Sequence, residues 1–490
     1  MSRGGLPSVK DKPPPCRQQF PSFSLLLPCF SHLFVLTLAM ACKHTVLQLN
    51  SSPFAELAGY EQPDAAARAS AETTSGRAPK SVKDHSIGTF PAPLVLPHDD
   101  LNYDPDSSPQ STKEWLNEEC RNKVLSATGR NKLYVVEVPG ISKKADFMRH
   151  WVVPTGYDEL KGEGKAGPSP PSADHFVDYL TAFYHDMPVR LFPTALTWTS
   201  WGSNTKSAKG CRSAALPKYI GLSHGDRCTR IRVRPAPDTA FPAQLNLDDI
   251  LDTAISILPA DAYAMVILVD HDIYESDDDD FCCGRAYGGS RVAVVQTARY
   301  NPALDEREGD GIERSHMWPW SHCKTFVDDL CAVEDVKAKP ATKRQKESSK
   351  SGAMKAAIQT ATTYRPTSEV QEYQALWFSR LARTVSHELG HCFAIDHCVY
   401  YACNMQGTGS MKEDVRQPPY LCPVCEAKVA HAISGEMKGG REDEKKEWVK
   451  QRCQALRHFC ERLGDKGMDS SMWQGLDGWL EERLKTWRIE

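Results

Sequence analysis

Apolar and polar residues follow two distinct periods along the middle of this 490-residue chain. The strongest strand is predicted at 262–269, where the apolar run Ala-Tyr-Ala-Met-Val-Ile-Leu-Val is unbroken. Such a run is typical of a strand that is buried on both faces near the centre of a parallel sheet. Residues 247–258, directly before it, have the three- and four-residue apolar spacing of a helix. A helix followed by a buried strand predicts an α/β fold.

Further elements flank this pair on both sides. Strands are expected at 132–138, 189–192, 281–286 and 291–297, and helices are expected to begin near residues 111 and 177. Cys282 and Cys283 fall in one of these strands, where neighbouring side chains point to opposite faces, so packing is favoured over a shared metal ion. The acidic run Asp277–Asp280 is interpreted as a solvated loop, with a hard-cation site as the alternative.

A long amphipathic helix is predicted after Pro366, with Thr367 or Ser368 as its cap. The residues of its apolar stripe recur three or four positions apart: Tyr373, Trp377, Leu381, Thr384 and Val385. This helix runs directly into a segment that is rich in histidine and cysteine. A packed helix would therefore carry the first residues of that segment, which holds them in fixed positions.

The N-terminal residues 1–93 are predicted to be a disordered arm. They are rich in Ala, Ser, Pro and charge, and they lack sustained periodicity. Within the arm, a basic stretch precedes an apolar run at 23–39, an order typical of a signal peptide or a signal anchor. Pro28 and His32 interrupt the run, which argues against a spanning helix. An alternative start at Met40 would place the run outside the protein.

Two other stretches differ from the central region. Residues 431–490 are predicted to be a helical tail with two apolar stripes, whose aromatic residues would pack on the core or on a partner protein. A Lys-rich stretch at about 333–360 is predicted to be a solvated insertion. Neither stretch shows a pattern of metal-binding or catalytic residues.

Composition narrows the class of protein. Lys and Arg number 59 and Asp and Glu number 63, so the net charge of −4 gives no reason to expect a nucleic-acid partner. The 17 cysteines lack the framework of a small secreted disulfide scaffold, which favours a reducing compartment, taken here as the cytoplasm. Hydrophobic residues make up 41% of the chain, enough for a sizeable core. No stable membrane insertion is expected.

His387 and His391 stand four residues apart near the end of the long predicted helix. On a helix this spacing stacks both imidazoles on one face, where they can bind one zinc ion. Glu388 points about 100° round the helix from His387 and can reach a water on that ion without displacing it. Zinc lowers the pKa of such a water to about 7. Glu388 would then be the general base as the water attacks a carbonyl, and would pass the proton to the leaving amine.

The third ligand of this site is predicted to be His397. If the helix continued, His397 would lie about 9 Å beyond His391, so the chain must leave the helix between them. The extended motif HExxHxxGxxH uses a glycine for that turn, and here Ala394 occupies the position. A left-handed alanine costs about 1–2 kcal/mol, and a turn of different shape is the alternative. Asp396 is a second choice of ligand, less favoured because His397 matches the motif spacing.

Four cysteines form a second set of metal ligands. They occur as two short-spaced pairs: Cys398 with Cys403, and Cys422 with Cys425. Four thiolates complete a tetrahedral zinc shell and leave no open position for a substrate. The spacing therefore predicts a structural zinc site, which brings the expected number of zinc ions to two per chain.

The order of these motifs resembles the archaemetzincin family of zinc metallopeptidases. HExxH, a third histidine, C-x4-C-x-M and CxxC follow one another at His387–His391, His397, Cys398–Met405 and Cys422–Cys425. The resemblance covers roughly residues 94–430. We expect this region to be the catalytic domain, between the N-terminal arm and the helical tail.

The resemblance also implies a fold and a function. Met405 would lie in a Met-turn beneath the catalytic metal. The fold would be zincin-like, a mixed twisted sheet with an antiparallel edge strand at Phe281–Ala286 above the cleft and the active-site helix behind it. The expected activity is zinc-dependent hydrolysis of a peptide or protein substrate. The alternative is a zinc-stabilised binding module that recruits partners through the tail, and the intact Glu388 argues against it.

Overall fold

The computed structural model describes residues 42–79, 85–100, 102, 108–125, 129–157, 170–202, 216–305 and 312–487. Apart from Cys42, these residues belong to one compact unit, Lys43–Glu490. The basic and apolar stretches considered as a signal or anchor lie outside the described residues. Within the described part, no helix combines the length and apolar character needed to cross a membrane.

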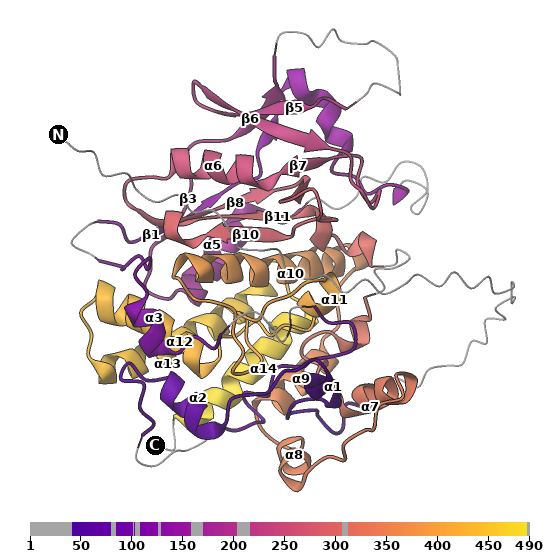
Figure 1. Ribbon diagram of the computed structural model, residues 1–490, viewed down its shortest axis with the longest axis vertical. Coiled ribbons are helices and arrows are strands. Elements are labelled where there is room, and N and C mark those ends of the chain that lie inside the picture. Colours follow the sequence, from indigo (N-terminus) through magenta and orange to yellow (C-terminus); the bar gives the residue numbers. More distant parts are fainter. Residues whose placement is uncertain are drawn as a thin grey trace, which may run out of the picture. The chain divides into compact units, whose positions relative to one another are not determined.

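A five-stranded sheet lies at the centre of this unit (Figure 1). Its strands are ordered β10 (Gly284–Tyr287), β11 (Val292–Gln296), β8 (Ala262–Val269), β1 (Lys132–Val136) and β3 (Val189–Leu191). β3, β1, β8 and β11 run parallel, and β10 pairs with β11 in the antiparallel direction. The predicted α/β class, with a mixed sheet and an antiparallel edge strand, is confirmed.

The central strand β8 separates two hydrophobic cores because its side chains alternate between the two faces of the sheet. Met265, Ile267 and Val269 contribute to the core on one face, and Val266 and Leu268 to the core on the other. All eight residues of β8 are buried. The continuous apolar run in the sequence follows from this burial on both faces.

The first core lies between the central sheet and a second, six-stranded sheet. The order of the second sheet is β2 (Gly140–Ile141), β4 (Thr197–Ser200), β5 (Tyr219–His224), β6 (Arg227–Arg234), β7 (Gln244–Asn246) and β9 (Asp272–Tyr274). Helix α6 (Leu247–Ile257) packs against strands of both sheets, and Ile250, Leu251 and Ala254 are buried there. The predicted helix before β8 is therefore present, and it joins the two sheets.

The second core lies on the opposite face of the central sheet, where α10 (Glu369–Cys392) runs beneath β8, β11 and β10 (Figure 1). Ser368 caps this helix by accepting a hydrogen bond from the backbone N–H of Gln371. From Trp377 to Gly390 every residue of α10 is buried. The predicted long helix is thus a central element of the core, and its last turn carries the histidines.

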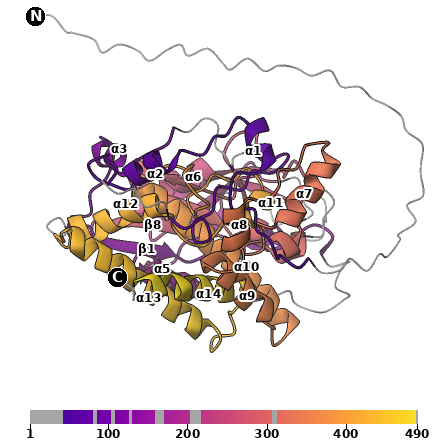
Figure 2. The ribbon, with the colours of Figure 1, turned by 90° about the horizontal axis from the view of Figure 1, so that it is seen from below.

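The remaining elements of the unit are helices. They are α1 (Pro53–Leu57), α2 (Ala65–Ala71), α3 (Thr112–Asn117), η2 (Lys143–His150), α5 (Ala173–Phe183), η3 (Gly288–Ser290), η4 (Ala298–Tyr300), η5 (Pro302–Leu304), η6 (Arg314–His316), α7 (Lys324–Val333), α8 (Lys343–Ser348), α9 (Ala353–Thr363), α11 (Met411–Asp414), α12 (Pro423–Ala430), η7 (His431–Met437), α13 (Glu442–Leu463) and α14 (Ser471–Thr486). Figure 2 shows α9, α13 and α14 along one side of α10.

The C-terminal tail is part of the second core rather than an appendage. α13 packs on α5, and α14 packs on α9. Trp448, Trp473 and Trp479 are at most 2% exposed and belong to the same hydrophobic cluster as the lower face of β8. The ring of Trp479 stacks on Tyr420 at a centroid distance of 4.1 Å. The predicted apolar stripes are present, and they are buried within the chain.

Residues 44–79 and 85–93 correct the prediction of a disordered arm. Leu47 and Leu49 are completely buried, and Leu47 pairs with Cys323 in an isolated β-bridge. Its N–H also donates to the hydroxyl of Ser349, 2.9 Å away. That bond draws α8 into the fold, so the Lys-rich stretch is not simply a solvated insertion. The prediction was wrong because the apolar residues of both stretches pack on distant parts of the chain rather than forming a local period.

Candidate metal centre and substrate cleft

The end of α10 brings the first two predicted ligands together. The Nε2 atoms of His387 and His391 lie 3.0 Å apart, and their ring centroids are separated by 4.7 Å. The helix ends at Cys392, one residue after His391, and Phe393 is its C-cap residue. The two imidazoles thus project from one face of the last turn, as their four-residue spacing predicts.

Ala394 makes the turn that carries the chain from the helix to His397. Its φ is +59°, in the left-handed region that glycine usually occupies. The N–H of Ala394 donates to the carbonyl of His391, and the N–H of Ile395 to that of Gly390. The alanine therefore takes the conformation that the motif glycine would take, at a cost of about 1–2 kcal/mol.

This turn places His397 beside the two helical histidines. Its ring centroid lies 5.4 Å from that of His387 and 5.1 Å from that of His391. One ring nitrogen of each residue lies within 4.8 Å of the others, a spacing that suits three ligands of one ion. Asp396 is more exposed, and its carboxylate accepts a hydrogen bond of 2.7 Å from Gln110 Nε2.

Backbone carbonyls orient the two helical histidines. The Nδ1 atom of His387 lies 2.7 Å from the carbonyl oxygen of Asn404, and that of His391 lies 2.7 Å from the carbonyl oxygen of Ile395. A carbonyl oxygen can only accept a hydrogen bond, so each Nδ1 carries the proton and each Nε2 presents a lone pair. Burial, followed by the neighbouring histidines, lowers the pKa of His387 well below its usual value. The neutral ring is the form that binds a metal ion.

Glu388 lies on the sheet side of the same helical turn, only 7% exposed. Burial raises its pKa to about 8, an effect that the nearby Arg285 opposes and Glu275 reinforces. Gly284 of β10 approaches so closely that a Cβ there would lie 3.2 Å from both Cγ and Oε1 of Glu388. A carboxyl group held in this way binds a proton more readily than a surface glutamate does.

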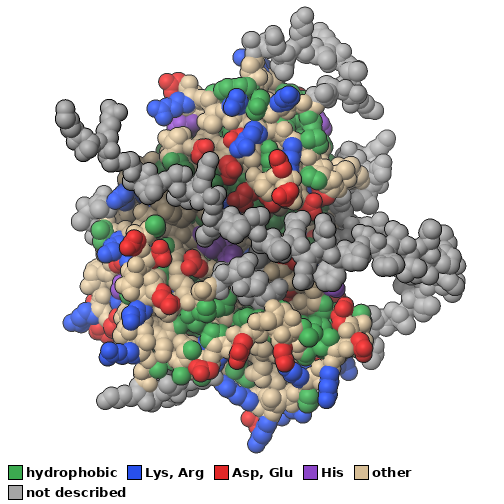
Figure 3. All heavy atoms as spheres, in the orientation of Figure 1, with side chains coloured by type: hydrophobic (Ala, Val, Ile, Leu, Met, Phe, Trp, Pro, Cys, Tyr) green, Lys and Arg blue, Asp and Glu red, His purple; other side chains and the backbone are tan. Residues whose placement is uncertain are grey.

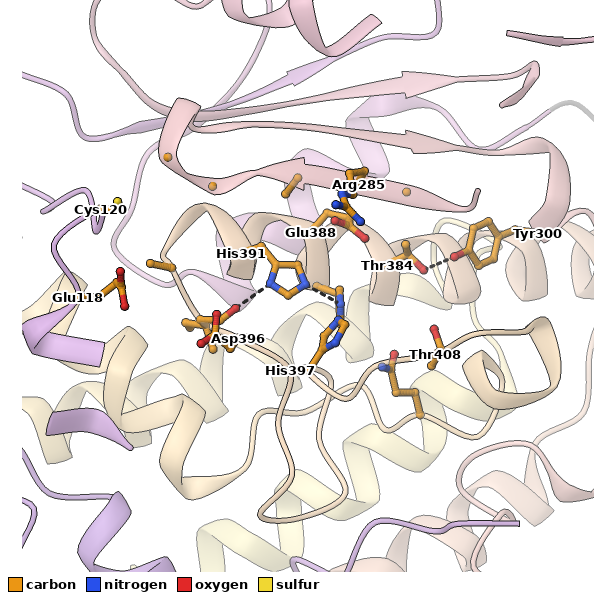
Figure 4. A pocket seen from close by; sticks show the side chains of 18 residues that line it. Glu118, Cys120, Arg285, Tyr300, Thr384, Glu388, His391, Asp396, His397 and Thr408 are labelled. Carbon is orange, nitrogen blue, oxygen red and sulfur yellow. Dashed lines mark hydrogen bonds between the residues drawn. The ribbon is translucent and has the colours of Figure 1, made fainter. Parts of the chain in front are cut away.

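A cleft of about 500 Å³ opens over these residues between α10 and β10. Figure 4 shows His391, His397 and Glu388 facing it from below and Arg285 from the strand above. In Figure 3, histidine side chains are visible near the middle of this face of the molecule. Further side chains, which the sequence analysis did not identify as site residues, also line the cleft: Glu118, Cys120, Arg285, Tyr300, Thr384, Thr408 and Gln417.

Thr384 and Tyr300 are two cleft residues that differ in whether the sequence could have identified them. Thr384 precedes His387 by one turn of α10, and its hydroxyl donates to the hydroxyl of Tyr300 at 2.7 Å. The helical period places Thr384 on the ligand side, so it could have been found from the sequence. Tyr300 follows β11 in the short helix η4, and only the fold brings it to the cleft.

Met405 lies directly beneath the ligand-bearing turn. A Cβ on Gly390 would overlap its sulfur, so the glycine provides the space that the methionine fills. The carbonyl of Met405 accepts a hydrogen bond of 2.7 Å from the N–H of Cys398. Met405 is 1% exposed.

The four cysteines converge behind the histidine site. Cys398, Cys403, Cys422 and Cys425 are buried, and their sulfurs lie within 4.8 Å of one another. The sulfur of Cys403 accepts a hydrogen bond of 3.2 Å from the N–H of Cys422. Four convergent thiols with backbone donors suit a closed zinc shell. The set is adjacent to the histidine set because Cys398 follows His397 directly in the chain.

The other candidates do not join either set. Of the acidic run, Asp277, Asp278 and Asp280 are exposed, which agrees with a solvated loop. Cys282 donates to the carbonyl of Gly284, and the sulfur of Cys283 contacts the sulfur of Met411 at 3.7 Å. Both thiols are therefore involved in packing, but they precede β10, so the alternation of a strand is not the reason.

Comparison with known proteins places the ligand-bearing segment in a family. The model of peptidase family M54 matches residues 365–431, which hold α10 and both ligand sets. Archaemetzincin-2 of Pongo abelii is 26% identical over 190 residues, 39% of this chain and 42% of the relative. Archaemetzincin-1 of Rattus norvegicus is 28% identical over 224 residues, 46% of this chain and 36% of the relative.

The chain thus spans less than half the length of the curated relatives it matches. A crystal structure of archaemetzincin from Methanopyrus kandleri is 15% identical and covers 62% of this chain and 96% of its own, with a TM-score of 0.29. The family match and the relatives agree with the motif order read from the sequence. Residues 365–431 of this chain therefore match peptidase family M54, and a longer stretch of the chain is similar to the archaemetzincins.

Proposed function

We propose that this protein is a zinc-dependent metallopeptidase. The observation that supports this most directly is the convergence of His387, His391 and His397 beside the buried Glu388, all facing one cleft. Three imidazole ligands leave one tetrahedral position open, which is typical of catalytic rather than structural zinc sites. A zinc ion bound there would supply a Lewis acid for a peptide carbonyl and lower the pKa of a water molecule.

Glu388 is the residue that moves the proton in this proposal. It lies on the same helical turn as His387, on the side that faces β10. Its unprotonated carboxylate accepts a proton from the attacking water, and the same carboxyl then donates that proton to the leaving amine. Burial raises its pKa to about 8, which favours the protonated state that the second step requires.

The edge strand β10 would align the substrate. β10 pairs with β11 along one edge and ends the central sheet on the other, and it lines the cleft directly above Glu388. An extended peptide can add to such an edge through backbone hydrogen bonds. Gly284 and Gly288 keep the strand close to α10, since a Cβ on Gly288 would overlap the carbonyl of His391. The proposed substrate is therefore an extended peptide segment.

The four-cysteine set would hold a second, structural zinc ion. It ties the loop after His397 to the start of α12, so it fixes the part of the chain that delivers the third histidine ligand. Four thiolates leave no open coordination position, so this site takes no part in hydrolysis. Two zinc ions per chain are proposed on these grounds.

The proposal is tested by incubating the purified protein with a library of peptides and comparing it with Glu388→Ala. The variant keeps all three histidines, so its zinc content should equal that of the wild type. We expect cleavage by the wild-type protein and a loss of at least about a hundredfold in the variant, the usual contribution of a general base. Equal cleavage by the two proteins would overturn the assigned role of Glu388.

A further inference from the structure

A third group of metal-binding side chains lies apart from the two sets described above. One ring nitrogen of His44, one of His316 and the sulfur of Cys323 lie within 4.8 Å of one another. His44 and His316 are 9% and 8% exposed, and Cys323 is completely buried. None of the three residues lines the substrate cleft. Two imidazoles and a thiol are donors that zinc prefers.

Both histidines have a buried ring nitrogen that the packing does not satisfy. Nδ1 of His44 and Nε2 of His316 have no hydrogen-bond partner among the residues that the structure describes. Leaving a buried polar atom unpaired costs about 1–3 kcal/mol, so two such atoms beside one thiol call for an explanation. A shared metal ion would satisfy both nitrogens at once.

The second nitrogen of His316 is oriented as in a metal ligand. Nδ1 lies 2.7 Å from the carboxylate of Glu313, which holds the proton on that side of the ring and leaves Nε2 with its lone pair. A carboxylate behind the distal nitrogen is the usual partner of a histidine that binds zinc. The ring also stacks on Phe326 at 3.9 Å, which fixes its plane.

The positions of Cys323 and His44 also favour binding. Cys323 is the N-cap residue of the ten-residue helix α7, where the helix dipole stabilises a thiolate. The ring of His44 packs edge-on against the ring of His316, with a distance of 5.5 Å between their centroids. The backbone of His44 is left-handed, with φ of +43°.

We propose that His44, His316 and Cys323 bind a zinc ion that ties the start of the compact unit to the loop before α7. The two chain segments already meet through the β-bridge between Leu47 and Cys323 and through the hydrogen bond from Lys324 N–H to the Val46 carbonyl. The ion would stabilise this junction and would not contribute to hydrolysis.

The experiment counts zinc in the full chain after saturation with zinc and exhaustive dialysis. His316→Phe is the most informative variant, because a phenylalanine preserves the stacking on Phe326 and removes both ring nitrogens. We expect it to contain one zinc ion fewer than the wild type, and Cys323→Ser to show the same loss. His458→Phe, at a side chain that is 68% exposed, is the matched control and should lose none.

Equal zinc content of His316→Phe and the wild type would overturn the proposal. If the variants fail to fold, the unmodified chain still decides the question when it is stripped of metal and titrated with zinc against a chromogenic chelator. Three sites in that titration support the proposal, and two overturn it. The first experiment measures the difference in zinc content between the wild type and the variant. Its result is therefore independent of whether the protein is a peptidase.

Discussion

Met405 packs beneath Gly390 so closely that a Cβ on the glycine would overlap the methionine sulfur and lie 2.9 Å from its terminal methyl carbon. The contact joins the end of α10 to the loop that carries Cys398 and Cys403. A change at either residue should therefore disturb both proposed zinc sites.

Gly390→Ala should destabilise the protein by about 1–3 kcal/mol, the usual cost of overpacking a core. At a helix position with free space, a glycine-to-alanine substitution stabilises by about 0.5–1 kcal/mol. The sign of the change in unfolding free energy therefore shows whether Met405 fills the space beside Gly390. The free energy of unfolding from urea titration measures it. In a Met405→Ala background the overlap is gone, and Gly390→Ala should become neutral or stabilising. The same loss in both backgrounds would contradict the proposed contact.

Ala394→Gly should stabilise the protein by about 1 kcal/mol. The alanine has a φ of +59°, a conformation that costs an L-residue about 1–2 kcal/mol and glycine almost nothing. The added flexibility of the unfolded glycine offsets part of that gain. The same unfolding titration is the measurement, with Ala394→Val as the opposite change, which should destabilise. Destabilisation by glycine would show that the turn does not need a left-handed residue.

Arg285→Gln should move the acid limb of the pH profile of kcat/KM to higher pH. Glu388 must be unprotonated to accept a proton, so activity rises as the pH passes its pKa. Arg285 lowers that pKa by its charge, and removing the charge raises it. Rates on one cleaved peptide across a pH series provide the measurement. Arg285→Lys keeps the charge and should leave the limb in place, whereas a shift to lower pH in the glutamine variant would refute the argument.

Trp479→Ala should destabilise the protein by about 3–5 kcal/mol, as expected for the loss of a buried tryptophan. The ring is completely buried, stacks on Tyr420 and donates from Nε1 to the carbonyl of Thr89 at 3.1 Å. Trp201 is 42% exposed, so Trp201→Ala serves as the control and should change the unfolding free energy by less than about 0.5 kcal/mol. Similar small effects of both substitutions would mean that the tail is an independent appendage.

The elements that the sequence predicted correctly are those with a local signal. The apolar run at Ala262–Val269 marked a strand buried on both faces, and all of its residues are buried. The four-residue spacing of His387 and His391 required only a helix to bring the rings together. The six-residue spacing between His391 and His397 indicated only that the helix must end between them. The motif then indicated that His397 is the third ligand.

What the sequence could not predict depends on contacts between distant segments. The β-bridge between Leu47 and Cys323 joins two segments whose sequences show no strand periodicity. The prediction of a disordered N-terminal arm was wrong for this reason. His44 and His316 come together through the same junction. The apolar stripes of the tail are visible in the sequence. Their pattern does not show whether they pack on the core of the chain or on a partner protein.

The proposal that three histidines form a catalytic zinc site is tested most directly by His397→Ala. Zinc content by elemental analysis and cleavage of a peptide substrate should be measured on the same preparation. We predict that the variant contains one zinc ion fewer than the wild type and has lost its peptidase activity, while the four-cysteine site keeps its metal. Zinc content and activity equal to those of the wild type would contradict the site as described.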